Sequence, residues 1–74
     1  MDTTLFYEQL KQILDTEEVK PENVLKDLET WDSLAILSVM AMADAQFGVV
    51  IKAEEMRSLV TVADLANLIR TKQK

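Results

Sequence analysis

Apolar residues recur at helical spacing at both ends of the chain. At about 100° per residue, one stripe predicts an amphipathic helix over about residues 4–15; it consists of Phe6, Leu10, Ile13 and Leu14. A second stripe predicts a helix over about residues 62–72; it consists of Val62, Leu65, Ala66 and Ile69, with Leu68 at its margin. Thr61 precedes this second helix, and Asp64 follows three residues later, which is typical of a capping box.

The segment over about residues 33–47 is apolar around nearly its whole circumference, and Asp44 is its one charge. We expect its core face to consist of Ile36, Val39, Met40, Ala43 and Phe47. A second apolar group consists of Leu34, Leu37 and Ala41. Gly48 follows at the position where a left-handed residue ends a helix. A helix of this kind is either central in the fold or binds a partner through its second face.

Two connections separate these helices. Residues 16–31 contain Pro21 and form a long loop, and the spaced apolar residues in it predict an ordered segment pinned to the core; these are Val19, Val24, Leu25 and Leu28. Residues 49–51 are apolar, but no second strand is available to pair with them, so we expect a buried loop. Residues 53–59 are predicted to form a short helix.

Composition supports an all-α fold in one domain. The chain has 74 residues, 49% of them hydrophobic, with a single Gly and a single Pro, too few for a turn-rich β fold. The net charge of −5 leaves no basic patch for nucleic acid. There is no apolar run of about 20 residues to span a bilayer, and no signal-peptide pattern at residues 1–4. We therefore expect a monomeric, cytoplasmic protein.

The chain has no cysteine and no histidine, which excludes the common zinc sites and both Ser-His-Asp and Cys-His catalysis. An EF-hand is excluded as well, because the alternating ligands and the required Gly are missing from the acidic loop. No catalytic or metal site is therefore expected, and the protein is predicted not to be an enzyme. Asp32-Ser33 before an apolar helix is also typical of a simple N-cap. An unmodified helical interaction module, with Ser33 as its cap, is therefore one interpretation.

Three motifs in order point to another interpretation. They are Asp32-Ser33-Leu34, Phe47-Gly48-Val49-x-Ile51 and Thr61-Val62-Ala63-Asp64-Leu65. Together with the order of helices and loops, they resemble the acyl carrier protein family and its relatives, the phosphopantetheine-binding carrier domains. The resemblance covers essentially the whole chain, and the length suits a single free-standing carrier domain over residues 1–74.

The resemblance implies a small four-helix bundle of three main helices and one short helix. It implies that Ser33 receives 4′-phosphopantetheine from coenzyme A through a separate phosphopantetheinyl transferase. The terminal thiol of the arm then holds acyl intermediates as thioesters and shuttles them between biosynthetic enzymes. Asp32, Leu34 and Trp31 would serve recognition by the transferase, with Asp32 contributing to its metal site. An acyl- or aminoacyl-loading enzyme and transiently docking pathway enzymes are the other implied partners.

Two departures from the family pattern favour a specialised, polyketide-like or other secondary pathway. The residues before the motif, Leu28-Glu29-Thr30-Trp31, lack the Gly that is usual there, and the following helix is almost uncharged. An aminoacyl or peptidyl carrier of a nonribosomal-peptide-type system is the alternative. We expect a docking patch with an apolar centre and an acidic rim; it consists of Leu34, Leu37 and Ala41, with Glu29, Asp27 and Asp44. Alternatively, Leu37 and Ala41 pack against the loop or the short helix. Trp31 is expected to lie partly buried beside Ser33, where it would also touch the arm.

Overall fold

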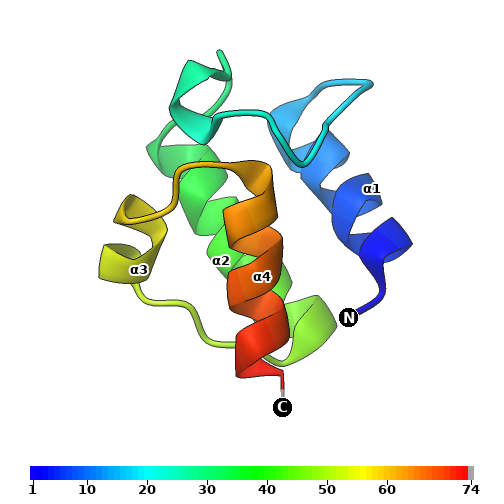
Figure 1. Ribbon diagram of the computed structural model, residues 1–74, viewed down its shortest axis with the longest axis vertical. Coiled ribbons are helices and arrows are strands. Elements are labelled where there is room, and N and C mark those ends of the chain that lie inside the picture. Colours follow the sequence, from blue (N-terminus) through cyan, green and yellow to red (C-terminus); the bar gives the residue numbers. More distant parts are fainter. Residues whose placement is uncertain (74) are drawn as a thin grey trace.

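The chain folds into a bundle of helices in a computed structural model that describes residues 1–73 (Figure 1). The helices are α1 (Thr3–Leu14), α2 (Ser33–Phe47), α3 (Ala53–Arg57) and α4 (Val62–Lys72), with a 3-10 turn, η1, at Leu25–Asp27. The predicted all-α bundle of three main helices and one short helix is confirmed. Within residues 1–73, no helix is long and apolar enough to cross a membrane.

The ends of the helices follow from local hydrogen bonds. α2 and α4 span the predicted residues, whereas α1 is shifted by one residue. Asp2 caps α1 by accepting a hydrogen bond from the Leu5 N–H at 3.0 Å, and Asp15 leaves the helix in the left-handed region, at φ 51°. α3 ends at Arg57, two residues before the predicted end. It ends early because the chain turns there and brings the Val60 carbonyl to the Leu25 N–H.

The predicted glycine end of α2 and the predicted capping box at the start of α4 are confirmed. Gly48 takes φ 66° and donates its N–H to the Asp44 carbonyl at 3.0 Å. At α4, the Asp64 N–H donates to Thr61 Oγ1 at 3.2 Å, and the Thr61 N–H donates to Asp64 Oδ2 at 3.0 Å. The pKa of the Asp64 carboxyl lies below its ordinary value. The main cause is the hydrogen bond from the Thr61 N–H, followed by the one from the Val60 N–H, because both bonds favour the charged form.

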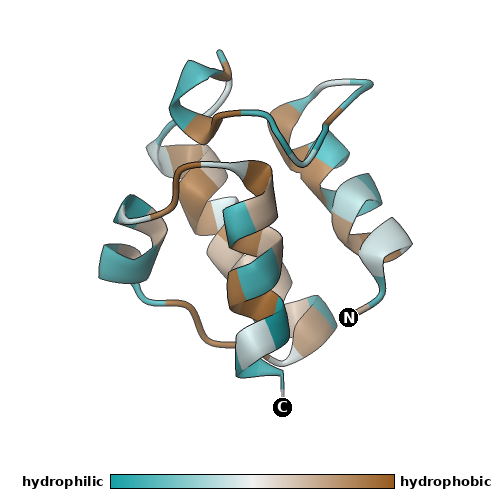
Figure 2. Ribbon diagram, in the orientation of Figure 1, coloured by the Kyte–Doolittle hydropathy of each residue, from teal (hydrophilic) through white to brown (hydrophobic). Residues whose placement is uncertain are grey.

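The core lies where α1 and α4 face α2, and the brown faces of Figure 2 turn inward there. The stripe of α4 is confirmed, since all four of its predicted core residues are buried and Leu68 is half-buried. The stripe of α1 is confirmed at Phe6, Leu10 and Leu14, whereas Ile13 is only half-buried.

The predicted core face of α2 was turned by less than a quarter turn from the true one. The buried residues of the helix are Ala35, Val39, Met42 and Ala43. Three residues that were assigned to the core are half-buried instead, namely Ile36, Met40 and Phe47. The reason is that α2 is apolar around most of its circumference, so its own periodicity does not select a buried face. Packing of its neighbours selects it.

The long connection between α1 and α2 is ordered, as predicted. Val19 and Leu25 are buried, and backbone hydrogen bonds join this connection to the segment before α4. The Leu25 N–H donates to the Val60 carbonyl at 2.9 Å, and the Val62 N–H donates to the Asn23 carbonyl at 3.0 Å. These bonds link the α1–α2 connection to the α3–α4 connection at the end of the bundle away from the N-terminus (Figure 1).

The connection between α2 and α3 is only partly the buried loop that was predicted. Val49 and Ile51 are buried, but Val50 is 70% exposed. Successive side chains of an extended segment point to opposite sides, so residues 49 and 51 face the core and residue 50 faces outward.

Candidate functional site

Ser33 is the first residue of α2, at the end of the bundle opposite the chain termini (Figure 1). The residue before it, Asp32, caps the helix: its Oδ1 accepts a hydrogen bond from the Ala35 N–H at 2.9 Å. Ser33 is exposed, and within residues 1–73 its hydroxyl takes part in no hydrogen bond. The interpretation of Ser33 as the helix cap is therefore wrong, because Asp32 performs that role.

The start of α2 offers donors to an anion. The first backbone bond of the helix runs from the Ile36 N–H to the Asp32 carbonyl at 3.0 Å, so the N–H groups of Ser33 and Leu34 precede the helical ladder. These N–H groups and the positive end of the helix dipole favour a negatively charged group on Ser33. The exposed hydroxyl can therefore accept a phosphodiester without loss of an internal hydrogen bond.

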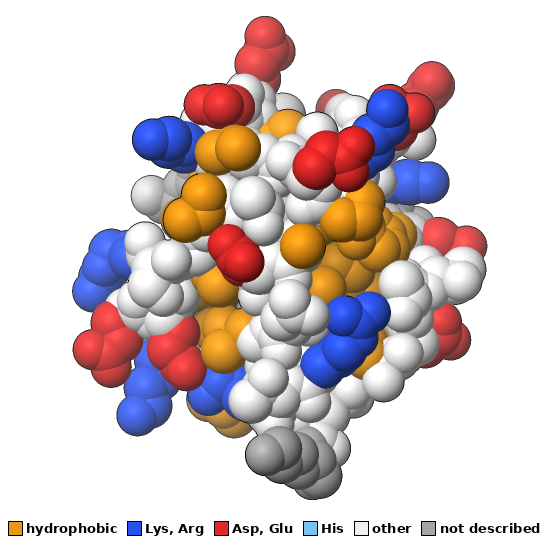
Figure 3. Space-filling model, in the orientation of Figure 1, with side chains coloured by type: hydrophobic (Ala, Val, Ile, Leu, Met, Phe, Trp, Pro, Cys, Tyr) orange, Lys and Arg blue, Asp and Glu red, His pale blue; other side chains and the backbone are white. Residues whose placement is uncertain are grey.

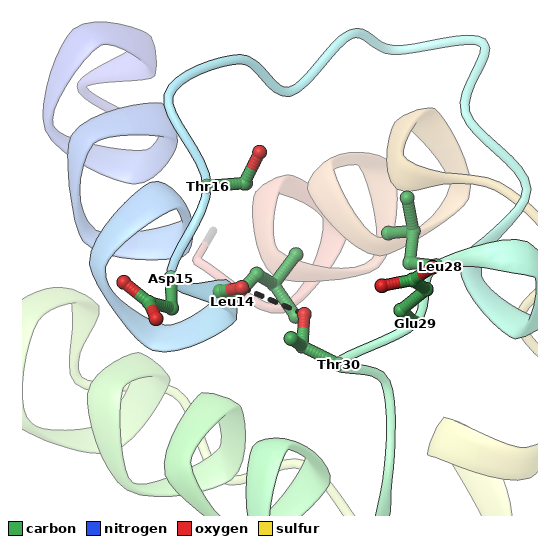
Figure 4. Close-up of a pocket in the computed structure, with 6 residues that line it drawn as sticks. All are labelled: Leu14, Asp15, Thr16, Leu28, Glu29 and Thr30. Carbon is green, nitrogen blue, oxygen red and sulfur yellow. Dashed lines mark hydrogen bonds between the residues drawn. The ribbon is translucent and has the colours of Figure 1, made fainter.

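The approach to Ser33 is held against α1. Figure 4 shows Thr30 beside the end of α1, where its Oγ1 donates to the Leu14 carbonyl at 2.7 Å. Leu14 is the last residue of α1, so this bond also satisfies one of the free carbonyls of that helix. The Trp31 N–H donates to the Leu28 carbonyl at 3.0 Å. Residues 30 and 31 are thus held from both sides, and the position of Ser33 is defined.

Trp31 is half-buried against the core, as predicted, and forms one wall of a cleft. We call this hollow the Trp31 cleft; it has a volume of about 320 Å³ and is lined by Val24, Leu25, Lys26, Trp31, Met56, Arg57, Ser58, Leu59 and Val60. The sequence analysis did not identify this cleft. Its walls come from two segments about 30 residues apart in sequence, and no local pattern relates them.

The expected docking residues of α2 lie on one exposed line. Leu34 is 72% exposed and Leu37 is 62% exposed, and Ala41 and Asp44 follow at helical spacing, also exposed. We call these four residues the α2 docking stripe. The alternative that Leu37 and Ala41 pack against the loop or the short helix is wrong. Two such large exposed apolar side chains beside each other are typical of a binding surface.

The two other expected docking residues, Asp27 and Glu29, are exposed in the connection that precedes α2 and not on the helix itself. They belong to a larger set of exposed carboxylates in this connection; the set consists of Asp15, Glu17, Glu18, Glu22, Asp27, Glu29 and Asp32. Figure 3 shows acidic side chains along the upper edge of the molecule, where this connection lies. Within residues 1–73, no group of carboxylates is placed to hold a metal ion.

Comparison with known proteins agrees with this geometry. Residues 3–69 match the family model described as a phosphopantetheine attachment site. An acyl carrier protein of Myxococcus xanthus is 39% identical over 56 residues, which cover 76% of this chain and 71% of that protein. An acyl carrier protein of Micrococcus luteus is also 39% identical over 56 residues, which cover 76% of this chain and 69% of that protein.

A solved structure has the same fold. The solution structure of a holo acyl carrier protein from Geobacter metallireducens superimposes with a TM-score of 0.78. The match covers 93% of this chain and 82% of that one, at 22% sequence identity.

Proposed function

Because this chain belongs to the family of phosphopantetheine attachment domains and is an acyl carrier protein, we propose that Ser33 is the residue that bears its 4′-phosphopantetheine group. One observation carries the proposal: the Ser33 hydroxyl is exposed at the start of α2 and has no hydrogen-bond partner among the described residues, while Asp32 caps the helix in its place. Such a hydroxyl is accessible to a transferase, and its modification leaves the cap intact.

The surroundings of Ser33 fit the group. A phosphodiester on Oγ would lie beside the N–H groups that open α2, which favour an anion. The neighbouring Asp32 carboxylate repels that phosphate, so Asp32 serves the helix and the transferase and does not bind the product. When bound, the arm supplies the thiol that this chain lacks, and acyl groups are held on that thiol as thioesters. The chain's own part is to position the arm and to present it to other enzymes.

The test is covalent modification of the intact chain. We expect a mass increase of one phosphopantetheinyl group after incubation with coenzyme A and a broad-specificity phosphopantetheinyl transferase. Ser33→Ala is expected to abolish this increase, whereas Ser38→Ala, in the same helix, is expected to retain it. Unmodified wild-type protein, under conditions that fully modify a known carrier, would contradict the assignment, and so would modification of Ser33→Ala.

Asp32 allows its two roles to be separated. Asparagine caps a helix about as well as aspartate, whereas alanine at the cap costs about 1 kcal/mol. We therefore expect Asp32→Asn to retain the free energy of unfolding and Asp32→Ala to lose about that amount in urea unfolding. Both variants are expected to be modified more slowly, because both lack the carboxylate that would reach the transferase metal. Normal modification of Asp32→Asn would limit Asp32 to the cap.

The almost uncharged α2 supports a specialised pathway as the setting of this carrier, because acidic docking of the kind used in bulk fatty-acid synthesis has few groups here. Asp44 is the one charge of the helix after its cap. We propose that the α2 docking stripe contacts a matching apolar surface on the pathway enzymes and that Asp27 and Glu29 steer the approach. An aminoacyl carrier is the second candidate. The modified protein distinguishes the acyl carrier from the aminoacyl carrier. Only the aminoacyl carrier is expected to be loaded by an adenylating, amino-acid-activating enzyme.

A further inference from the structure

We propose that the Trp31 cleft binds acyl cargo that ends in a carboxylate, with Lys26 and Arg57 as the groups that recognise the negative end. The inference rests on the proposed attachment at Ser33 and specifies the class of cargo: an acyl chain that carries a second, distal carboxylate. It is carried by three features of the cleft, namely its charge, its distance from Ser33 and its rigidity.

The charge of the cleft is opposite to that of the protein. The chain has 13 acidic and 8 basic residues, yet the lining of this cleft contains Lys26 and Arg57 and no carboxylate. Within residues 1–73, neither cation forms an ion pair, in contrast to Lys20 and Lys72. The other side chains of the lining are apolar, with the exception of Ser58, whose hydroxyl donates to the Glu55 carbonyl at 2.8 Å.

Two other hollows of the described surface differ from the Trp31 cleft in the charge of their linings. One, of about 250 Å³, lies at the end of α1 and includes Asp15 and Glu29 in its lining. Another, of about 430 Å³, has Lys11 in its lining beside the carboxylates of Asp15 and Glu17. Carboxylates outnumber cations in both linings, which disfavours a negatively charged ligand there. The Trp31 cleft combines apolar walls with free cations, which suits an apolar chain with an anionic end.

The cleft is within reach of the attached arm. Trp31 and Ser33 are two residues apart, so their Cα atoms are separated by at most about 7.6 Å. The extended arm is much longer than this separation and is flexible. Its thiol end can therefore fold back along the indole of Trp31 and place the cargo between η1 and α3.

The cleft is held open by backbone hydrogen bonds before any ligand enters. The Leu25 N–H donates to the Val60 carbonyl at 2.9 Å, and an isolated bridge pairs Val24 with Thr61. The wall formed by α3 is held by an ion pair to α4, in which Lys72 Nζ lies 3.0 Å from Glu55 Oε2. A preformed site loses less free energy in ordering when cargo binds.

The test compares succinyl cargo with succinamoyl cargo, its neutral amide of nearly equal shape. Both are loaded onto Ser33 from their coenzyme A thioesters, and mass measurement confirms loading. The rate of thioester cleavage by hydroxylamine is then divided by the rate for the same acyl group on free pantetheine. We expect the succinyl form to be protected about two- to fivefold more than the succinamoyl form, the range expected for partly exposed charge pairs.

The double variant Lys26→Gln, Arg57→Gln is expected to abolish this difference. Lys20→Gln, Arg70→Gln removes the same charge outside the cleft and is expected to retain it. Emission of Trp31, the sole tryptophan, is expected to change on loading of succinyl cargo and to change less in the first double variant. Equal protection of both cargoes, protection of neither, or a difference that survives in Lys26→Gln, Arg57→Gln would overturn the inference. In all three cases the loaded mass would leave the attachment at Ser33 intact; absence of loading would overturn the attachment itself.

Discussion

Phe6→Ala is expected to lower the free energy of unfolding by about 3–5 kcal/mol, the range for removal of a buried aromatic ring. Phe6 is 0% exposed and is the largest fully buried side chain, and its ring meets Tyr7 edge to face at a centroid distance of 5.0 Å. A domain of this length has a total stability of roughly 4–11 kcal/mol at the usual value per residue. The variant is therefore expected to be largely unfolded or close to it.

Urea unfolding followed by circular dichroism measures this effect. Leu37→Ala serves as the matched control, because it also shortens a large apolar side chain, but one that is 62% exposed. The free energy of unfolding of Leu37→Ala is expected to stay within about 0.5 kcal/mol of the wild-type value. A loss of less than about 1 kcal/mol in Phe6→Ala would contradict the packing of α1 against the rest of the bundle.

Leu37→Glu is expected to separate docking from folding. A charge at this exposed position leaves the core unchanged, so circular dichroism and the urea midpoint are expected to match those of the wild type. The same charge at the centre of an apolar docking surface remains without a partner when the enzymes bind. We expect kcat/KM of the loading enzyme for the modified carrier to fall by about 30-fold or more, the usual size of an effect at a central interface residue.

The control for this prediction is Gln46→Glu. It adds the same charge to an exposed residue of α2, about 180° around the helix from Leu37 at about 100° per residue. Its kcat/KM is expected to stay within about twofold of wild type, since exposed rim charges contribute little to affinity. Equal losses in both variants would mean that general charge repulsion, and not contact with the α2 docking stripe, determines the rate. Unfolding of Leu37→Glu would contradict the exposed position of that side chain.

The features that were predicted correctly depend on residues close together in the chain. Gly48, Thr61 and Asp64 end or begin helices through bonds within one or two turns, so α2 and α4 span the expected residues. The stripe of α4 is clear because polar residues occupy its other face. Two helix ends were predicted wrongly. α1 ends one residue early because Asp15 takes a left-handed backbone angle, and α3 ends two residues early because the following turn places the Val60 carbonyl against the distant Leu25 N–H.

The sequence by itself determined the helices, the glycine end of α2, the capping box of α4, the Asp32-Ser33-Leu34 motif and the absence of any histidine or cysteine that could activate its serine. These follow from periodicity, capping and composition, which act locally. Only the tertiary structure decided which arc of α2 is buried, because a helix that is apolar all round has no preferred face until its neighbours pack. It also decided that Lys26 and Arg57 line the same cleft as Trp31. Those positions depend on contacts between segments far apart in the chain, and no pattern within either segment encodes them.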